Sequence, residues 1–143
     1  MMTWTRYGLL FGEVDVTAGL AEASAIRLPP GDASQTAEYR ERVGLTAVVS
    51  AFSDGARARY DAIVQDHSRV REIAQSVPHW YLVAMGVDPA RQGLGLGSLR
   101  GLSRVDQEGV ECHLFTEGSR NVSLYQRYGF EIAVEGDVPN SMT

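Results

Sequence analysis

The stretch HWYLVAMGVDPARQGLGLGSLRGLSRV, residues His79–Val105, decides the fold of this chain. Its first part, Trp80–Val87, is apolar on both of the alternating faces that a strand presents, which predicts a central strand covered on both sides. Asp88-Pro89 ends this strand. A glycine-rich turn then leads into a helix that we expect to run to about Gln107 and to stop at Gly109.

The turn after this strand has glycine at alternate positions, in GLGLGS, residues 93–98. The first turn of a helix has unpaired N–H groups and a positive dipole end, so a phosphate binds well there, and glycine lets it approach closely. A structural turn without a ligand and a dinucleotide site are the alternatives. The Rossmann spacing is absent, and no P-loop lysine follows because the chain contains no lysine. Spacing alone leaves phosphate binding and a structural turn both open.

Two motifs in the same order occur together in a known superfamily. VDPARQGLGLGSLR resembles motif A of the GCN5-related N-acetyltransferases (GNAT), in which Q or R is followed after two residues by G, one residue, and G or A. Gln92, Gly95 and Gly97 fill these positions. NVSLYQRYGFE, residues Asn121–Glu131, resembles motif B of the same superfamily. The resemblance covers about Gly12 to Glu135.

The segment RLPPG, residues Arg27–Gly31, with the helical stretch after it, is similar to the actinobacterial branch of these acetyltransferases. The resemblance implies an α/β (α+β) fold with a mixed, mostly antiparallel sheet and helices on both faces. Its central parallel strands, His79–Val87 and Val110–Thr116, would splay apart to hold acetyl-CoA. At 143 residues and 15.6 kDa, the chain fits a single domain spanning residues 1–143.

The first part of the chain predicts a hairpin and two helices. Alternation over Glu13–Thr17 and the run Glu22–Leu28 predict a β-hairpin, and Pro29–Asp32 form a loop. Helical spacing begins at about Gln35 and is interrupted at Ser53–Gly55, where Ser53 or Asp54 would cap the second helix. The apolar stripes are Leu45, Val48, Val49 and Phe52, then Tyr60, Ile63, Val64, His67 and Val70. We interpret His67 as a core or boundary residue.

The last part predicts a strand, a helix and a second strand. On the strand after Gly109, we expect Cys112, Leu114 and Thr116 to face the core, and Glu111, His113, Phe115 and Glu117 to face away. Ser119 or Asn121 would cap a helix over Val122–Tyr128, and Gly129 would end it. Phe130–Glu135 would form the last strand.

The composition excludes several classes of function. A net charge of −5 without a basic face argues against nucleic-acid binding. The single cysteine, Cys112, rules out an internal disulfide, and no long apolar segment predicts a membrane span. The three histidines and one cysteine are not at metal-ligand spacings, so we expect no metal. We expect a cytoplasmic protein.

The resemblance implies acetyl-CoA as cosubstrate and assigns its contacts. The pyrophosphate would rest on the N–H groups of the turn, and the pantetheine arm would pair with the open edge of the strand. The residues involved would be Met85, Val87, Gln92, Gly93, Leu94, Gly95, Leu96, Gly97, Ser98, Asn121 and Tyr125. Tyr125 would give a proton to the departing thiolate, or else only pack its ring. Asn121 would bind the cofactor's amide arm, cap its helix, or do both.

The implied activity is transfer of the acetyl group to a primary amine of a small molecule or peptide. One alternative is a non-catalytic CoA-binding or interaction module derived from the same fold, and another is a structural domain without a ligand. For the general base we find only Glu117, Asp15 and His113, each equally compatible with a solvated strand residue. No base is assigned.

The resemblance also raises an expectation about the ends of the chain. Acetyltransferases of this kind open with a strand and two helices before the hairpin and close with an inserted strand. By this comparison we expect a chain truncated at the N-terminus and at the C-terminal strand. Bare sheet edges would then favour a homo-oligomer such as a dimer, or marginal stability with impaired activity.

Overall fold

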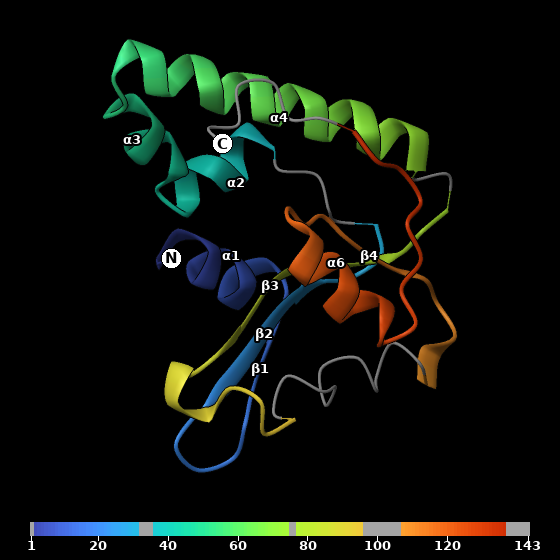
Figure 1. The fold of residues 1–143 in the computed structure, drawn as a ribbon. Coiled ribbons are helices and arrows are strands. Elements are labelled where there is room, and N and C mark those ends of the chain that lie inside the picture. The colour runs from blue at the N-terminus through green and yellow to red at the C-terminus, as the bar shows by residue number, and fades with distance from the viewer. Residues whose placement is uncertain (1, 32–35, 75–76, 96–106, 137–143) are drawn as a thin grey trace.

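The computed structural model describes residues 2–31, 36–74, 77–95 and 107–136. Four strands form one sheet in the order β1-β2-β3-β4, with bounds Glu13–Val16, Ala23–Leu28, Trp80–Val87 and Cys112–Leu114. The pairs β1–β2 and β2–β3 are antiparallel, and β3–β4 is parallel (Figure 1). The predicted α+β class and mixed, mostly antiparallel sheet are confirmed.

The predicted hairpin is formed by β1 and β2, which pair from Glu13 opposite Arg27 to Val16 opposite Ser24. Two hydrogen bonds between Thr17 and Ala23 close the hairpin. The Thr17 N–H donates to the Ala23 carbonyl at 2.9 Å, and the Thr17 hydroxyl accepts from the Ala23 N–H at 3.1 Å. Within the described chain, β1 has no strand on its outer side. Self-association through this edge stays a prediction.

Three helices, not two, separate the hairpin from β3. The helices before β3 are α1 (Met2–Phe11), α2 (Ala37–Arg42), α3 (Leu45–Ser50) and α4 (Asp54–Ala74). Gly44 splits the predicted first helix because its φ of 78° lies in the left-handed region, where a right-handed helix cannot continue. Ser53 caps α4 as expected, since its hydroxyl accepts from the Ala56 N–H at 3.4 Å.

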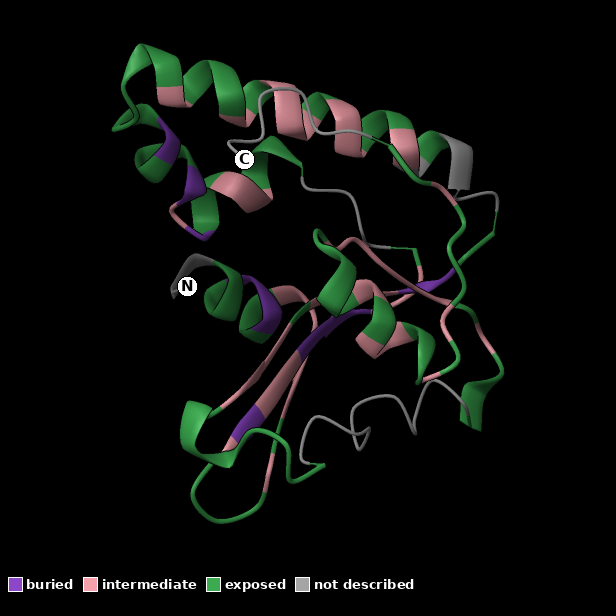
Figure 2. Cartoon of the chain, viewed as in Figure 1, coloured by how far each residue is buried: buried purple, intermediate pink, exposed green. Residues whose placement is uncertain are grey.

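The core lies between α1, α2 and α3 and one face of the sheet. Leu28 at the end of β2 is 1% exposed and packs with buried side chains from α1, α3 and the α2–α3 junction. Figure 2 shows the buried segments in purple. These partners are Tyr7, Val43, Leu45 and Val49. On the opposite face the indole Nε1 of Trp80 donates to Glu108 Oε2 at 2.8 Å. Residues 107–108 are helical and Gly109, with φ 64°, follows them, so helical residues reach both faces.

The strand after Gly109 is shorter than expected, and both of its faces are covered. Cys112 and Leu114 are half-buried, but so are His113 and Phe115. The Phe115 ring lies 3.7 Å, between centroids, from the His67 ring of α4. The prediction that only the Cys112 face meets the core is therefore wrong, because α4 covers the other face.

The region after β4 differs from the prediction in two places. The last helix, α6 (Ser119–Gln126), begins earlier than expected, after Gly118, so neither Ser119 nor Asn121 is its N-cap. Gly129 ends it as predicted, with φ 86°. Residues 130–136 form no strand, because none of them pairs with a described strand. The predicted strand over Phe130–Glu135 is wrong.

A buried arginine links β1 to β2. The side chain of Arg27 is 2% exposed, and its Nη2 donates to Glu13 Oε2 at 3.2 Å and to Asp15 Oδ2. Its guanidinium also lies 5.6 Å from the centre of the Trp80 ring. Within the described chain, its Nε and Nη1 have no hydrogen-bond partner. Two carboxylates and a ring face thus offset the desolvation of a buried cation.

We expect removal of the carboxylates to cost more stability than removal of the cation. The double variant Glu13→Gln/Asp15→Asn leaves the guanidinium buried without an anion, which should cost about 3–5 kcal/mol. Arg27→Met leaves carboxylates whose side chains are 30% and 44% exposed and can hydrate, so the loss should be smaller, about 1–2 kcal/mol. Urea unfolding followed by circular dichroism measures both.

The control is Asp61→Asn, which breaks an exposed pair with Arg57 at 3.0 Å and should change the free energy of unfolding by less than about 0.5 kcal/mol. Equal losses in Arg27→Met and the double variant would show that the ion cluster does not hold the hairpin.

Candidate active site

The parallel pairing of β3 with β4 ends early and leaves part of β3 open. The paired residues run from Trp80 opposite Cys112 to Leu82 opposite Leu114. Beyond them, β3 continues to Val87 and stays paired with β2, up to Val87 opposite Ala23. On its other side this part of β3 has no described strand. The predicted splay of the two central strands is therefore present, starting after Leu82.

A β-bulge lies beside the start of this split. The β2–β3 register shifts between Ile26 and Arg27, which face Ala84 and Leu82 respectively, so Val83 is an extra residue. Ala25 shares a face with Arg27 and lies opposite Met85. The bulge therefore moves Met85 onto the face of Leu82, whereas simple alternation had placed it on the face of Tyr81 and Val83. This part of the predicted alternation is wrong.

The open part of β3 leads directly into the glycine-rich turn. Asp88 ends the strand, and its Oδ1 accepts from the Ala90 N–H at 2.8 Å at the start of the short 3-10 helix η1 (Pro89–Arg91). Gln92 donates from Nε2 to the Val87 carbonyl at 3.3 Å. Gly93 and Gly95 have φ of 79° and 77°, which L side chains rarely adopt.

The whole turn is exposed from Arg91 to Gly95. Of the predicted cofactor contacts, Leu96, Gly97 and Ser98 lie outside the described residues. The described part, Arg91–Gly95, is exposed and has glycine at two positions of positive φ, both compatible with close approach of an anion.

The hairpin anchors this turn through Glu22, which sequence analysis missed. The Glu22 carbonyl accepts from the Asp88 N–H at 2.7 Å, and its carboxylate Oε1 lies 2.7 Å from Arg91 Nε. The Glu22 side chain is 18% exposed and that of Arg91 is 48% exposed. No local pattern could have indicated this pair, because its partners come from distant parts of the chain and meet only when β2 pairs with β3.

The helix α6 carries the two remaining predicted site residues. Asn121 is exposed, and its Nδ2 donates to the Glu117 carbonyl at 3.1 Å. Tyr125 is half-buried and its ring makes an edge-to-face contact with Phe130, with centroids 5.7 Å apart. Desolvation by burial raises the pKa of the Tyr125 phenol above its ordinary value of 10.0. This phenol is therefore protonated at neutral pH and can donate a proton.

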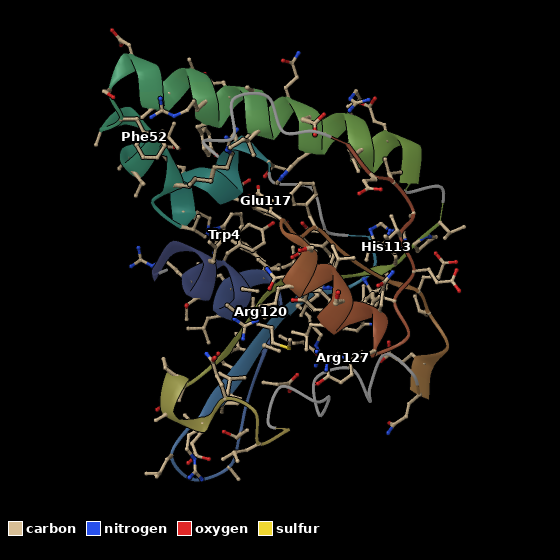
Figure 3. All side chains as sticks on the ribbon, viewed as in Figure 1. Trp4, Phe52, His113, Glu117, Arg120 and Arg127 are labelled. Carbon is tan, nitrogen blue, oxygen red and sulfur yellow. The ribbon has the colours of Figure 1, made fainter. Side chains whose placement is uncertain are left out.

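The three candidate bases lie in different surroundings. Asp15 is paired with buried Arg27, so its carboxylate already has a cation. Glu117 is exposed in the loop that leads into α6, whereas His113 lies beside β3 (Figure 3). His113 Nε2 is 3.0 Å from Glu111 Oε2, and its ring stacks on that of His79 with centroids 4.2 Å apart. His79 was not a candidate site residue from the sequence, because its stack on His113 forms only when β3 pairs with β4.

Within residues 2–31, 36–74, 77–95 and 107–136, three or more metal-ligating side chains do not gather in any one place. Among the same residues, every helix is too short or too polar to cross a membrane.

Comparison with known proteins bears on the fold. No protein-family model matches the sequence. The chain is similar in structure to a solved protein from Corynebacterium glutamicum ATCC 13032, described as "histone acetyltransferase HPA2 and related acetyltransferase", with a TM-score of 0.54 and 19% sequence identity. The similarity covers 95% of this chain and 63% of that one, so this chain spans less than two thirds of its neighbour's length.

This neighbour is an acetyltransferase by its description, and the described sheet has the split between β3 and β4 that the resemblance implied. Along the chain, the motif around Gln92 follows β3 and the motif around Tyr125 follows β4, in the order that the resemblance implies. The resemblance is confirmed at the level of the fold: the chain has the fold of the GCN5-related N-acetyltransferases.

Proposed function

We propose that this protein is an acetyl-CoA-dependent N-acetyltransferase that acts on a primary amine of a small molecule or a peptide. The observation that carries the proposal is the open edge of β3 after Leu82, which is followed, after the short helix η1, by an exposed glycine turn. A strand edge can pair with the amides of a ligand, and a glycine turn can bind its phosphates. A strand edge followed by such a turn therefore suits a ligand with amides at one end and phosphates at the other.

The dimensions of this edge fit an extended pantetheine arm. At about 3.3 Å per residue, the five steps from Val87 back to Leu82 span about 17 Å. The pyrophosphate would rest on the N–H groups of residues 92–98, and the arm would pair with the backbone of Met85 and Val87. The thioester would then lie beside Val83, where β3 and β4 part.

Acetyl transfer from this position forms a C–N bond and breaks the C–S bond of the thioester. The amine must arrive with a free lone pair, and the departing thiolate must gain a proton. Tyr125 supports the second step, because burial keeps its phenol protonated. Asn121 would contact the amide arm by exchanging its bond to the Glu117 carbonyl for one to the ligand.

The first prediction tests the turn. Acetyl-CoA should raise the melting temperature of the wild-type protein, because a ligand that binds only the native state stabilises it by RT ln(1 + [L]/Kd). Gly95→Glu should abolish this shift, since it places a side chain and a negative charge where the pyrophosphate would lie. A thermal-shift titration with CoA measures both.

The matched control is Gly31→Glu, which adds the same side chain at another exposed glycine of positive φ, 94°, in the loop after β2. It should keep the CoA shift. A full CoA shift in Gly95→Glu would remove the turn from the site.

The second prediction concerns the anchor of the turn. Glu22→Gln keeps the shape of the side chain but removes the charge that holds Arg91, so CoA affinity should fall about 2- to 5-fold, the size expected for a half-exposed ion pair. Calorimetric titration with CoA measures the change. Asp66→Asn is the control, because its pair with Arg69 is also 2.7 Å long and its side chain is 13% exposed. If both variants bind CoA like the wild type, Glu22 does not position the turn.

The third prediction tests Tyr125. Tyr125→Phe keeps the ring against Phe130 but removes the phenol, so kcat should fall about 100-fold while CoA affinity stays unchanged. In the wild type, kcat should also decline as the pH rises above 10.0 through the raised pKa, and this decline should be absent in the variant. Tyr128→Phe, at the end of the same segment, is the control. Unchanged turnover in Tyr125→Phe would leave the ring with a packing role only.

An amine panel separates this function from a non-catalytic CoA-binding module. Ethanolamine, a polyamine, an aromatic amine and a lysine peptide can be tested with acetyl-CoA, with free thiol as the readout. Acetylation of one of them supports the enzyme, and CoA binding without acetylation of any of them would favour the module.

A further inference from the structure

Two histidines stack at the point where β3 and β4 begin to pair. The rings of His79 and His113 lie 4.2 Å apart between centroids and within 24° of parallel. His79 directly precedes β3 and is 7% exposed. The pairing of β3 with β4 begins here, because the Trp80 N–H donates to the Glu111 carbonyl at 2.8 Å. The stack is thus fixed by backbone pairing on both sides.

The contacts of His79 fix its tautomer. Its Nδ1 is 2.8 Å from the Val77 carbonyl, which can only accept, so Nδ1 carries the proton. Its Nε2 is buried and has no hydrogen-bond partner within the described chain. The other tautomer would leave a buried N–H unpaired at Nε2, which is costly.

The contacts of His113 give it the opposite arrangement. Its Nε2 lies 3.0 Å from Glu111 Oε2, and a carboxylate can only accept, so Nε2 carries the proton of the neutral ring. In that tautomer Nδ1 holds the lone pair. The side chain is 19% exposed.

The backbone of His113 lies close to the split in the sheet. His113 pairs with Tyr81, one step before the last β3–β4 pair, Leu82 with Leu114. Phe115 is two residues further along the chain from His113, and its ring contacts His67 of α4. The ionisable groups around His113 are therefore Glu111, His79, Tyr81 and, beyond Phe115, His67.

We propose that His113 is the general base of the acetyl transfer, and that Glu111 and His79 are positioning residues that leave Nδ1 as its only basic atom. As the amine nitrogen forms the C–N bond to the thioester carbon, its proton passes to His113 Nδ1. The C–S bond breaks, and the thiolate takes a proton from Tyr125. This inference rests on the proposed function, and it selects His113 from the three bases that the sequence left open.

The test compares His113→Gln with His67→Gln, which alters a histidine in ring contact with Phe115 but outside the β3–β4 pairing. With an amine that the wild type accepts, His113→Gln should lose about 100-fold in kcat/KM and should lose the decline of the rate at acidic pH. His67→Gln should keep both. The CoA thermal shift should be the same in all three proteins.

Nuclear magnetic resonance of the histidine rings provides a readout that does not depend on turnover. At neutral pH His113 should be the Nε2–H tautomer and His79 the Nδ1–H tautomer. Glu111→Gln should reduce the share of the Nε2–H tautomer of His113 and lower kcat/KM together.

The possible outcomes distinguish the role of His113 from the enzyme function and from CoA binding. If the wild type acetylates an amine and His113→Gln keeps its rate and pH profile, the role of His113 is wrong and the enzyme function stands. If the wild type binds CoA but acetylates no amine of the panel, the base assignment falls with the enzyme function, and the CoA turn stands. If the wild type does not bind CoA, both proposals fail.

Discussion

The end of the β3–β4 pairing at Leu82 and Leu114 is the constraint on which the rest of this structure depends. Beyond it, the backbone groups on one side of β3 have no strand partner in the described chain, and such groups need partners when they are shielded from water. The strand keeps its shape because β2 holds its other side as far as Val87. The bulge at Val83 adds a residue at the same point, which turns Met85 to the other face.

The strand β2 connects the parts that this open edge requires. At one end Arg27 binds the two carboxylates of β1 and faces the Trp80 ring, and at the other end Glu22 holds the turn through Asp88 and Arg91. Arg27 and the Glu22–Arg91 pair act through ionic contacts, and Glu22 and Asp88 are joined by a backbone hydrogen bond. The same strand therefore fixes the hairpin, supports β3 and positions the candidate phosphate turn.

The elements that depend on local residue patterns could be predicted from the sequence. The hairpin, the central strand, the glycine turn and the stop at Gly129 follow from alternation and from glycine chemistry, and the structure has them all. The extra helix break at Gly44, the missing strand after Phe130 and the reversed face of Met85 depend on pairing between distant strands or on one left-handed residue. The candidate site shows the same division: motif residues such as Gln92 and Tyr125 could be named from order, whereas Glu22 and His79 contact partners far along the chain.

Hydrogen exchange with and without CoA tests the central claim most directly, because it reports on each backbone N–H. The account predicts that CoA slows exchange in the open part of β3, Val83–Val87, and in residues 92–98, and leaves the hairpin residues Glu13–Thr17 unchanged. Protection confined to other segments, or an unchanged β3 in protein that is shown to bind CoA, would contradict a cosubstrate site at the split between β3 and β4.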